Sequence, residues 1–184
     1  MAEMTREQAL ALMQSRLKNK NLQKHVLAVA AVMKRLARRL GADAETWELV
    51  GLLHDLDYEE TLKDPDRHGL VSAQWLREQG VAEEIVQAVM AHANKAPRDV
   101  PINQAAFCAD PVTGLLVACA LIHPDKKLAG LDVPFVLNRF KEKRFAAGAD
   151  RDRIRAGEAL GLSLEEFLGL ALSAMQEIAG ELGL

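Results

Sequence analysis

Aromatic residues are scarce in this sequence, and their scarcity narrows the fold class. Phe, Trp and Tyr make up 4% of the 184 residues, whereas 49% are hydrophobic and 27% are charged. Leu, Ala, Glu, Lys and Arg dominate, β-branched residues are few, and no stretch alternates in the manner of a strand. Because such a composition favours helices, we expect an all-α fold with an aliphatic core. The length suits a single domain over residues 1–184.

The sequence also has no excess of basic over acidic residues. The formal net charge is −3, which is not typical of general nucleic-acid binding, although a mononucleotide or a polymer end is compatible with it. The N-terminus has no basic segment followed by an apolar one, and the longest apolar run, Gly114 to Ile122, is too short to span a bilayer. We therefore expect a soluble, cytoplasmic protein that acts without a membrane.

Cysteine is limited to Cys108 and Cys119, which lie in apolar surroundings and far from any Cys-x-x-Cys spacing. This pattern does not indicate a thiolate metal site, and both residues are expected to be reduced members of the core. Metal-binding groups are therefore sought among the histidines and carboxylates.

Short signals delimit several of the expected helices. Thr5 begins a capping box with the glutamine three residues later, Asp43 is an expected N-cap, and Ser163 begins a second capping box. Gly41 and Gly161 follow apolar stripes at the position where helices commonly end. Beyond residue 122 the pattern predicts helices over 133–144, 150–160 and 163–178.

Histidine is infrequent, but most of the histidines fall on the apolar faces or at the ends of expected helices. His25 lies in the apolar stripe of a helix expected over 22–40, three residues after Leu22. His92 follows an apolar residue by three positions and therefore points inward as well. A lone histidine on such a face is more often a core residue bonded to a backbone carbonyl. The metal hypothesis therefore depends on the whole set.

A His-Asp pair, His54-Asp55, closes the helix that begins at Asp43. Consecutive residues are separated by about 100° on a helix, so both reach one ion only where the helix ends. An acidic residue at the negative end of a helix dipole is unfavourable by itself and indicates a nearby cation. The following segment, residues 57–67, is too polar for a core and is either functional or a solvated connector. His68 comes directly after it and opens the next helix.

Asp110 lies within an apolar segment, residues 102–122, directly before Pro111. Proline pushes the preceding residue away from helical angles, so the helix either kinks at Asp110 or restarts there with Asp110 as its N-cap. Capping explains an aspartate at this position without any metal. A carboxylate has two oxygens, however, and can cap a helix and bind an ion at the same time.

Four imidazoles and two carboxylates thus form one candidate metal site, which consists of His25, His54, Asp55, His68, His92 and Asp110. Nitrogen and oxygen donors of this kind suit Mn, Fe, Co, Ni or Zn, with Mg as a further option, better than Ca or a structural thiolate zinc site. We expect one or two divalent ions in a pre-formed site, because the donors are spread over packed helices.

The order of these residues resembles that of the HD superfamily of metal-dependent phosphohydrolases, which is a His, a His-Asp doublet and a distant Asp. In this sequence the four are His25, His54, Asp55 and Asp110. His68 and His92 lie in the interval where members with two metals carry two further histidines. The match covers about residues 20–122. It departs from many members at Leu56-Asp57, where those members read Ile-Gly, and this puts in doubt whatever the glycine does for substrate access.

The resemblance implies an HD-domain-like helical bundle with additional C-terminal helices over residues 123–184. It implies that the four residues of the family order hold one ion, that the two further histidines hold a second, and that Asp55 bridges them. A water between the ions would become hydroxide and attack phosphorus, which makes Asp55 the central catalytic residue.

Phosphate recognition requires cations near the metal site, and the C-terminal part supplies candidates. Lys127 follows an expected helix end, and Lys141 and Arg144 lie on the helix expected over 133–144. We expect these three to bind substrate, and a plain charged surface is the alternative. Three residues of the polar loop are candidates for proton transfer or leaving-group contact, or else are solvated: Glu59, Glu60 and Lys63.

The sequence favours a phosphohydrolase that acts on a nucleotide or another small phosphoester. A di-iron oxygenase with the same ligand set is one alternative, which iron content and oxygen uptake would separate. A non-catalytic helical binding or signalling module is the other. The oligomeric state stays open, with a homodimer among the options.

Overall fold

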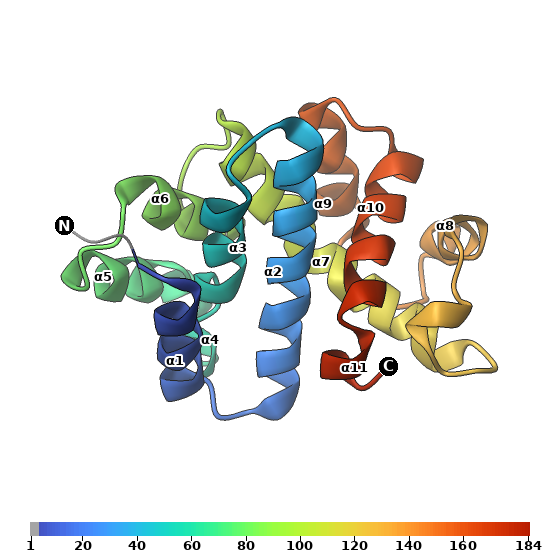
Figure 1. Ribbon diagram of the computed structural model, residues 1–184, viewed down its shortest axis with the longest axis horizontal. Helices are drawn as coiled ribbons and strands as arrows, with labels where there is room; N and C mark the ends of the chain where they lie inside the picture. Colours follow the sequence, from blue (N-terminus) through green and yellow to red (C-terminus); the bar gives the residue numbers. More distant parts are fainter. Residues whose placement is uncertain (1–3) are drawn as a thin grey trace.

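The computed structural model describes residues 4–184, and this range consists of helices with no strand between them (Figure 1). The predicted all-α fold is confirmed. The elements in chain order are α1 (Arg6–Arg16), α2 (Lys20–Leu40), α3 (Ala44–Leu53), α4 (Tyr58–Thr61), η1 (Pro65–Arg67), α5 (Leu70–Glu78), α6 (Glu83–His92), α7 (Pro101–Ile122), η2 (Leu128–Gly130), α8 (Val133–Lys141), α9 (Arg151–Arg155), η3 (Ala156–Leu160), α10 (Leu164–Glu177) and α11 (Ala179–Leu182).

Helix α2 is central, with α1 and α3 on one side of it and α10 and α11 on the other in this view (Figure 1). Its apolar face is buried, including Val29 and Met33, so the hydrophobic effect holds neighbouring helices against it. Helix α7 packs against α2, α6, α9 and α10. The N-terminal and C-terminal helices therefore share the core that α2 and α7 form.

Helices α2 and α3 approach each other closely at Gly51. A Cβ atom added there would lie 2.4 Å from the Cα atom and 2.6 Å from the nitrogen of Ala30. Two backbones come this near only where one residue has no side chain. The close approach also sets the position of His54, three residues later, relative to α2.

Gly51→Ala is expected to destabilise the protein by about 1–3 kcal/mol or more, because a new methyl group meets backbone that cannot turn aside. Chemical denaturation measures the change. Gly114→Ala on α7 is the matched control, since nothing lies within 4 Å of an added Cβ there. Alanine is favoured over glycine inside a helix by about 1 kcal/mol, so the control should not destabilise. A Gly51→Ala protein as stable as wild type would contradict the close packing of α2 and α3.

The predicted helix boundaries at the capping signals are confirmed. Thr5 forms the capping box of α1, Asp43 caps α3, and Ser163 caps α10. Gly41 ends α2 with a φ of 69°, and Gly161 ends η3 with a φ of 76°, both in the left-handed region that favours glycine.

Helix α7 contradicts one prediction, because it runs unbroken from Pro101 to Ile122 with Pro111 inside it. Its N-cap is Val100, so the interpretation of Asp110 as the N-cap of a restarted helix is wrong. The side chain of Asp110 is therefore not occupied with capping a helix.

The helix expected over 133–144 ends at Lys141, so Arg144 lies in the loop that follows. Arg151 donates hydrogen bonds to the carbonyl oxygens of five residues, which are Phe140, Glu142, Phe145, Ala146 and Ala149. These bonds stabilise the loop in place of further helical turns. The helix expected over 150–160 likewise divides into α9 and the 3₁₀ helix η3.

Helix α7 is long and apolar enough to cross a bilayer, judged by length and composition alone, with a mean hydropathy of 1.9 over its most apolar window. The uninterrupted apolar run from Gly114 to Ile122, which by itself is too short to span a bilayer, is only part of this helix. The helix continues on the other side of Asp110, which is its one charged residue. Since 67% of the window is buried inside the protein, its position in the core explains its apolar composition.

Candidate metal centre

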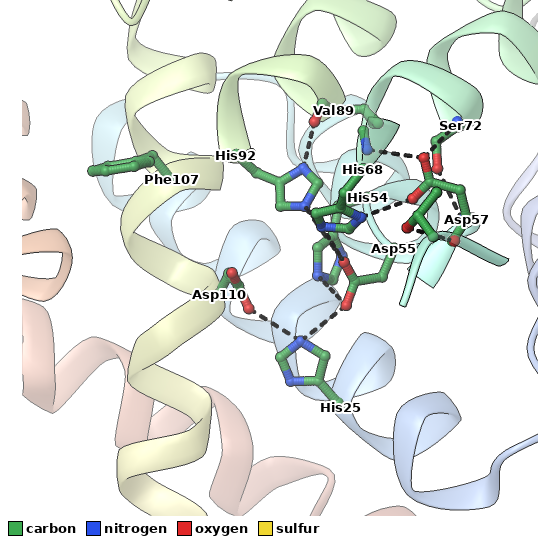
Figure 2. Close-up of polar contacts among 12 residues, drawn as sticks. His25, His54, Asp55, Asp57, His68, Ser72, Val89, His92, Phe107 and Asp110 are labelled. Atoms are coloured by element: carbon green, nitrogen blue, oxygen red, sulfur yellow. Dashed lines mark hydrogen bonds and ion pairs between the residues drawn. The ribbon is translucent and has the colours of Figure 1, made fainter. Parts of the chain in front are cut away.

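Six side chains that are far apart in the sequence meet at one point of the fold (Figure 2). They come from α2, the end of α3, the turn before α5, the end of α6 and the middle of α7. Together they form the six-residue centre, which consists of His25, His54, Asp55, His68, His92 and Asp110. The predicted convergence is confirmed, while the binding of metal by these residues stays a prediction.

Asp55 lies in the middle of the centre, and its two oxygens face different histidines. Oδ2 lies 3.5 Å from Nε2 of His25 and 3.4 Å from Nε2 of His54. Oδ1 lies 3.4 Å from Nε2 of both His68 and His92. Oδ1 of Asp110 adds to the first group, 3.1 Å from Nε2 of His25. The Asp55 carboxylate thus divides the centre into the two groups of donors that a bridging role requires.

The rings of His54 and His92 are oriented by the helices that carry them. Nδ1 of His54 lies 2.8 Å from the carbonyl oxygen of Gly51, and Nδ1 of His92 contacts the carbonyl oxygen of Val89. Since a carbonyl oxygen only accepts hydrogen bonds, Nδ1 carries the proton of each neutral ring and Nε2 carries the lone pair. Both Nε2 atoms point into the centre (Figure 2).

The rings of His25 and His68 are oriented by side chains. Nδ1 of His68 donates to Oδ1 of Asp57 at 2.9 Å. Nδ1 of His25 lies 3.1 Å from the hydroxyl of Thr113, whose own proton goes to the carbonyl oxygen of Asp110, so the Thr113 oxygen accepts from His25. All four rings therefore direct Nε2 inward, with the other nitrogen held from outside as in metal-binding histidines.

The inward-facing nitrogens lack hydrogen-bond donors. Nε2 of His54 is buried without a hydrogen-bond partner among residues 4–184. Nε2 of His68 and Nε2 of His92 are 3.0 Å apart, and two lone pairs facing each other repel unless a cation or a proton is present. Donor atoms of His25, His54 and Asp110 lie within 4.8 Å of one another, as do those of His54, Asp55 and His92. This set of donors fits a divalent metal.

Charge in the centre is negative enough to attract a cation. Burial alone would raise the pKa of Asp55, but the neighbouring imidazoles of His54 and His92 hold that pKa well below its usual range. Burial also opposes ionisation of Asp110, yet the neighbouring imidazole of His25 lowers its pKa. Burial lowers the pKa of His54, but the neighbouring Asp55 charge outweighs it and raises the pKa to about 9. The cation that these groups attract is either a proton or a metal ion.

Protons and metal ions should therefore compete for the centre. An imidazole protonated at Nε2 has no lone pair for a metal, so bound metal is expected to fall as the pH drops through about 6.5. The raised pKa of His54, about 9, gives the same sign and extends the competition up to about pH 9, because its protonated form gains as the pH falls through that value. Elemental analysis after dialysis at several pH values between about 10 and about 4 measures the loss, and circular dichroism shows whether the fold persists. Constant metal content down to about pH 4 would contradict an imidazole-rich site.

One side of the centre is open to solvent. Its inner side chains are at most 7% exposed, whereas those of His25, His68 and Asp110 are 22–25% exposed. A hollow of about 400 Å³ lies in front of His25 and Asp110. Its other lining residues are small or apolar: Pro111, Gly114, Ala118, Ala146, Gly148 and Ala149. A small molecule therefore has a route to the centre from this side.

Asp57 contacts the centre from behind His68, a position that the sequence does not reveal. The polar loop is predicted to be either functional or a solvated connector, and the structure shows that Asp57 is fully buried and that α4 and η1 form within the loop. Its carboxylate accepts hydrogen bonds from the backbone N–H of Gly69 at 2.8 Å and of Ser72 at 2.9 Å, besides the bond from His68. Burial would raise the pKa of Asp57, but the hydrogen bonds from His68 and Ser72 lower it. Because Asp57 stands where many family members have glycine, the His68 ring lies between two carboxylates, with Asp55 at Nε2 and Asp57 at Nδ1.

Glu59 has a structural position, while its predicted role in proton transfer or leaving-group contact stays a prediction. Its carboxylate accepts hydrogen bonds from the backbone N–H of Lys18 at 2.5 Å and of Asn19 at 3.3 Å. These bonds attach α4 to the turn between α1 and α2. Glu60 and Lys63 are exposed residues on the same loop, and their roles stay predictions.

The three cations predicted to bind substrate are all exposed, and they are Lys127, Lys141 and Arg144. Lys141 lines a second hollow of about 640 Å³, which shares Gly148 and Ala149 with the hollow at the centre. Lys127 and Arg144 line neither of these hollows. Substrate binding stays a prediction for all three, with spatial support for Lys141 alone.

The cysteines behave as the sequence predicted. Cys108 and Cys119 are buried in the core, and burial raises the pKa of the Cys108 thiol to about 12 and that of the Cys119 thiol to about 11. Protonated thiols are poor metal ligands, so nitrogen and oxygen remain the donors of the centre.

Comparison with known proteins adds a family and several partial relatives. The model of the HD domain family matches residues 22–126, which is more than half of the chain and contains all six residues of the centre. Ribonuclease Y of Nitratidesulfovibrio vulgaris (strain DP4) is 27% identical over 96 residues, covering 52% of this chain and 18% of that protein. Ribonuclease Y of Salinispora arenicola is 31% identical over 77 residues, covering 42% of this chain and 13% of that protein. The chain thus spans less than a fifth of the length of these relatives.

Proposed function

The chain belongs to the HD domain family, and on this basis we propose that it is a metal-dependent phosphohydrolase. The observation that carries the proposal is the division of the Asp55 oxygens between two groups of inward-facing imidazole nitrogens. Such a division suits two divalent ions that share one carboxylate, an arrangement used for displacement at phosphorus.

The chain's own residues would hold and orient the reacting groups. One ion would be held by Oδ2 of Asp55 with His25, His54 and Asp110, and the other by Oδ1 of Asp55 with the two remaining histidines. Bound divalent ions supply an acidified water and neutralise the charge on phosphate oxygens. The Nδ1 hydrogen bonds keep the rings in place before substrate arrives, so little reorganisation is needed during the reaction. The buried inner side chains leave the His25 and Asp110 side as the route for water and substrate.

The substrate that we propose is a nucleotide or another small phosphoester. The hollow in front of His25 and Asp110 is about 400 Å³, which suits a small molecule or one end of a chain. The relatives are ribonucleases by name, which adds a short RNA end to the phosphodiesters worth testing. The net charge of −3 does not favour binding along a long nucleic acid.

Two measurements test the proposal. The first is elemental analysis of protein purified without added metal, and the second is an activity assay with phosphatase and phosphodiesterase substrates. We expect bound Mn, Fe, Co, Ni, Zn or Mg and hydrolysis that a chelator abolishes. His54→Ala should lose metal and activity together. His123→Ala is the matched control, because His123 is the chain's remaining histidine and contacts Phe135 and Asp125 outside the centre. A metal-loaded wild type inactive on every phosphoester would contradict the proposal.

The same donor set keeps a di-iron oxygenase as the second candidate, because four imidazoles and two carboxylates without a thiolate also suit iron. Iron as the predominant bound metal, together with substrate-dependent oxygen uptake, would favour it. A protein that shows neither phosphoester hydrolysis nor oxygen uptake with its metal bound would instead favour a binding or signalling module.

A further inference from the structure

Arg153 connects the C-terminal helices to the six-residue centre. It lies on α9, beyond the part of the chain that the family model matches. Its Nη2 atom donates to Oδ2 of Asp110 at 2.9 Å, and its side chain is 24% exposed. Among residues 4–184, no other lysine or arginine forms an ion pair with a residue of the centre.

Two backbone carbonyls that receive no hydrogen bond from within their own helices instead accept hydrogen bonds from the guanidinium of Arg153. Pro111 has no N–H, so the carbonyl oxygen of Phe107, four residues earlier in α7, lacks its usual helical donor. Arg153 donates to this oxygen from Nε at 3.2 Å and from Nη2 at 3.0 Å. His92 ends α6 with a carbonyl that has no helical donor either, and Nη2 of Arg153 lies 3.0 Å from its oxygen. Arg153 therefore contacts the backbone of one residue of the centre and the carboxylate of another.

The position of Arg153 is set by its own helix and by an aromatic ring. The side chain of Asp150 caps α9 by accepting from the backbone N–H of Arg153 at 3.1 Å, and Ile154 is fully buried next to it. The guanidinium carbon of Arg153 lies 4.6 Å from the centre of the Phe107 ring. A second guanidinium, that of Arg98, lies over the same ring at 3.9 Å. Packing and hydrogen bonds thus hold the Arg153 fork in one orientation.

This geometry divides the two oxygens of Asp110 between different partners. Oδ2 receives the Arg153 hydrogen bond, while Oδ1 lies 3.1 Å from Nε2 of His25 and faces the centre. Without Arg153 the carboxylate could rotate about its last bond, since that bond has no sharply preferred angle. A fixed carboxylate loses less freedom when it binds an ion, so the ion binds more tightly.

We infer that Arg153 is a positioning residue, which orients the Asp110 carboxylate so that Oδ1 is ready to bind a divalent cation. The inference rests on the proposed metal binding at the six-residue centre. It gives the C-terminal helices a role in the site, because α9 supplies an orienting group that the matched family region lacks.

Binding of Mn²⁺ alone, followed by electron paramagnetic resonance of the free ion, tests the inference without any substrate. Arg153→Met should weaken Mn²⁺ binding by about 10- to 100-fold, the usual cost of losing an outer partner of a metal ligand. Arg153→Lys should be intermediate, because an ammonium keeps the charge but lacks the fork. Arg155→Met is the control on the same helix, since Arg155 is exposed and pairs with Asp152 instead, and it should bind Mn²⁺ as wild type does.

Two further measurements distinguish positioning of Asp110 from a substrate contact and from a purely structural role. They are the melting temperature without metal and the KM of the best substrate at saturating metal. Wild-type Mn²⁺ affinity in Arg153→Met overturns the inference, and a raised KM in that case makes Arg153 a substrate contact. A lowered melting temperature with unchanged Mn²⁺ affinity makes it a purely structural residue and overturns the inference as well. If Arg153→Met does not fold, Arg153→Lys decides by the same affinity measurement. A chain that binds Mn²⁺ but hydrolyses no phosphoester contradicts the proposed function and leaves this inference standing.

Discussion

Replacing Asp55 with asparagine should lower phosphoester hydrolysis by at least about a hundredfold, comparable to removing a major electrostatic contributor from an active site. Asparagine keeps the size of the side chain but removes the charge that both groups of donors share. Oδ1 faces His68 and His92 and Oδ2 faces His25 and His54, so a single substitution weakens both candidate ion sites.

The fold should withstand Asp55→Asn better than it withstands a cavity in the core. The apolar residues of α3, including Trp47, Val50 and Leu53, are untouched and stay buried. Loss of bound metal removes only the stabilisation that ligand binding contributes. Metal content, melting temperature and turnover should be measured on one preparation, beside Asp66→Asn, which makes the same change at an exposed position. Near wild-type turnover in Asp55→Asn with the metal gone would contradict the mechanism.

Asp57→Asn should selectively damage the half of the centre that contains His68. The charged acceptor of the His68 Nδ1 proton disappears, and loss of an outer partner of this kind commonly reduces metal affinity or activity by about 10- to 100-fold. His25, His54 and Asp110 keep their own partners, so we expect metal content to fall from two ions towards one. Stability should also drop, by about 1–3 kcal/mol, because the N–H groups of Gly69 and Ser72 lose a charged acceptor.

Metal stoichiometry by elemental analysis and denaturation curves, both compared with wild type, measure the effect of Asp57→Asn. Asp64→Asn is the control, since Asp64 is exposed on the same loop and caps no helix through its side chain. Unchanged stoichiometry and activity in Asp57→Asn would show that His68 needs no orienting carboxylate. Loss of both ions together would show instead that the two halves of the centre bind metal as one unit.

The helix ends could be predicted because their causes act over a few residues. Asp43 accepts backbone hydrogen bonds from residues two and three positions ahead, and Gly41 takes the left-handed angle that ends α2. At Pro111 one of the two alternatives that local reasoning left open was wrong. A proline removes one helical hydrogen bond, and the sequence allows a kink or a restart of the helix there, but the helix does not restart. The freed carbonyl of Phe107 instead receives Arg153, so a tertiary contact offsets the local loss.

The six residues of the centre could also be predicted, because an apolar helix face points to the core wherever the helix packs. His25 and His92 lie on such faces, and the His54-Asp55 pair stands at a helix end, so their inward direction needed no knowledge of the partner helices. Their order along the chain added the family resemblance, and the HD domain match now supports it.

The groups that orient these residues were decided only by the tertiary structure. Thr113 is 88 residues from His25, and Arg153 is 43 residues from Asp110. A hydrogen bond forms only within about 3 Å and in the right direction, which depends on how α2, α7 and α9 pack. Asp57 shows the same dependence at shorter range, since its burial is favourable only because Gly69, Ser72 and His68 donate to it. Composition determines which residues prefer the interior, whereas the position of each donor and acceptor follows from the packing of the helices.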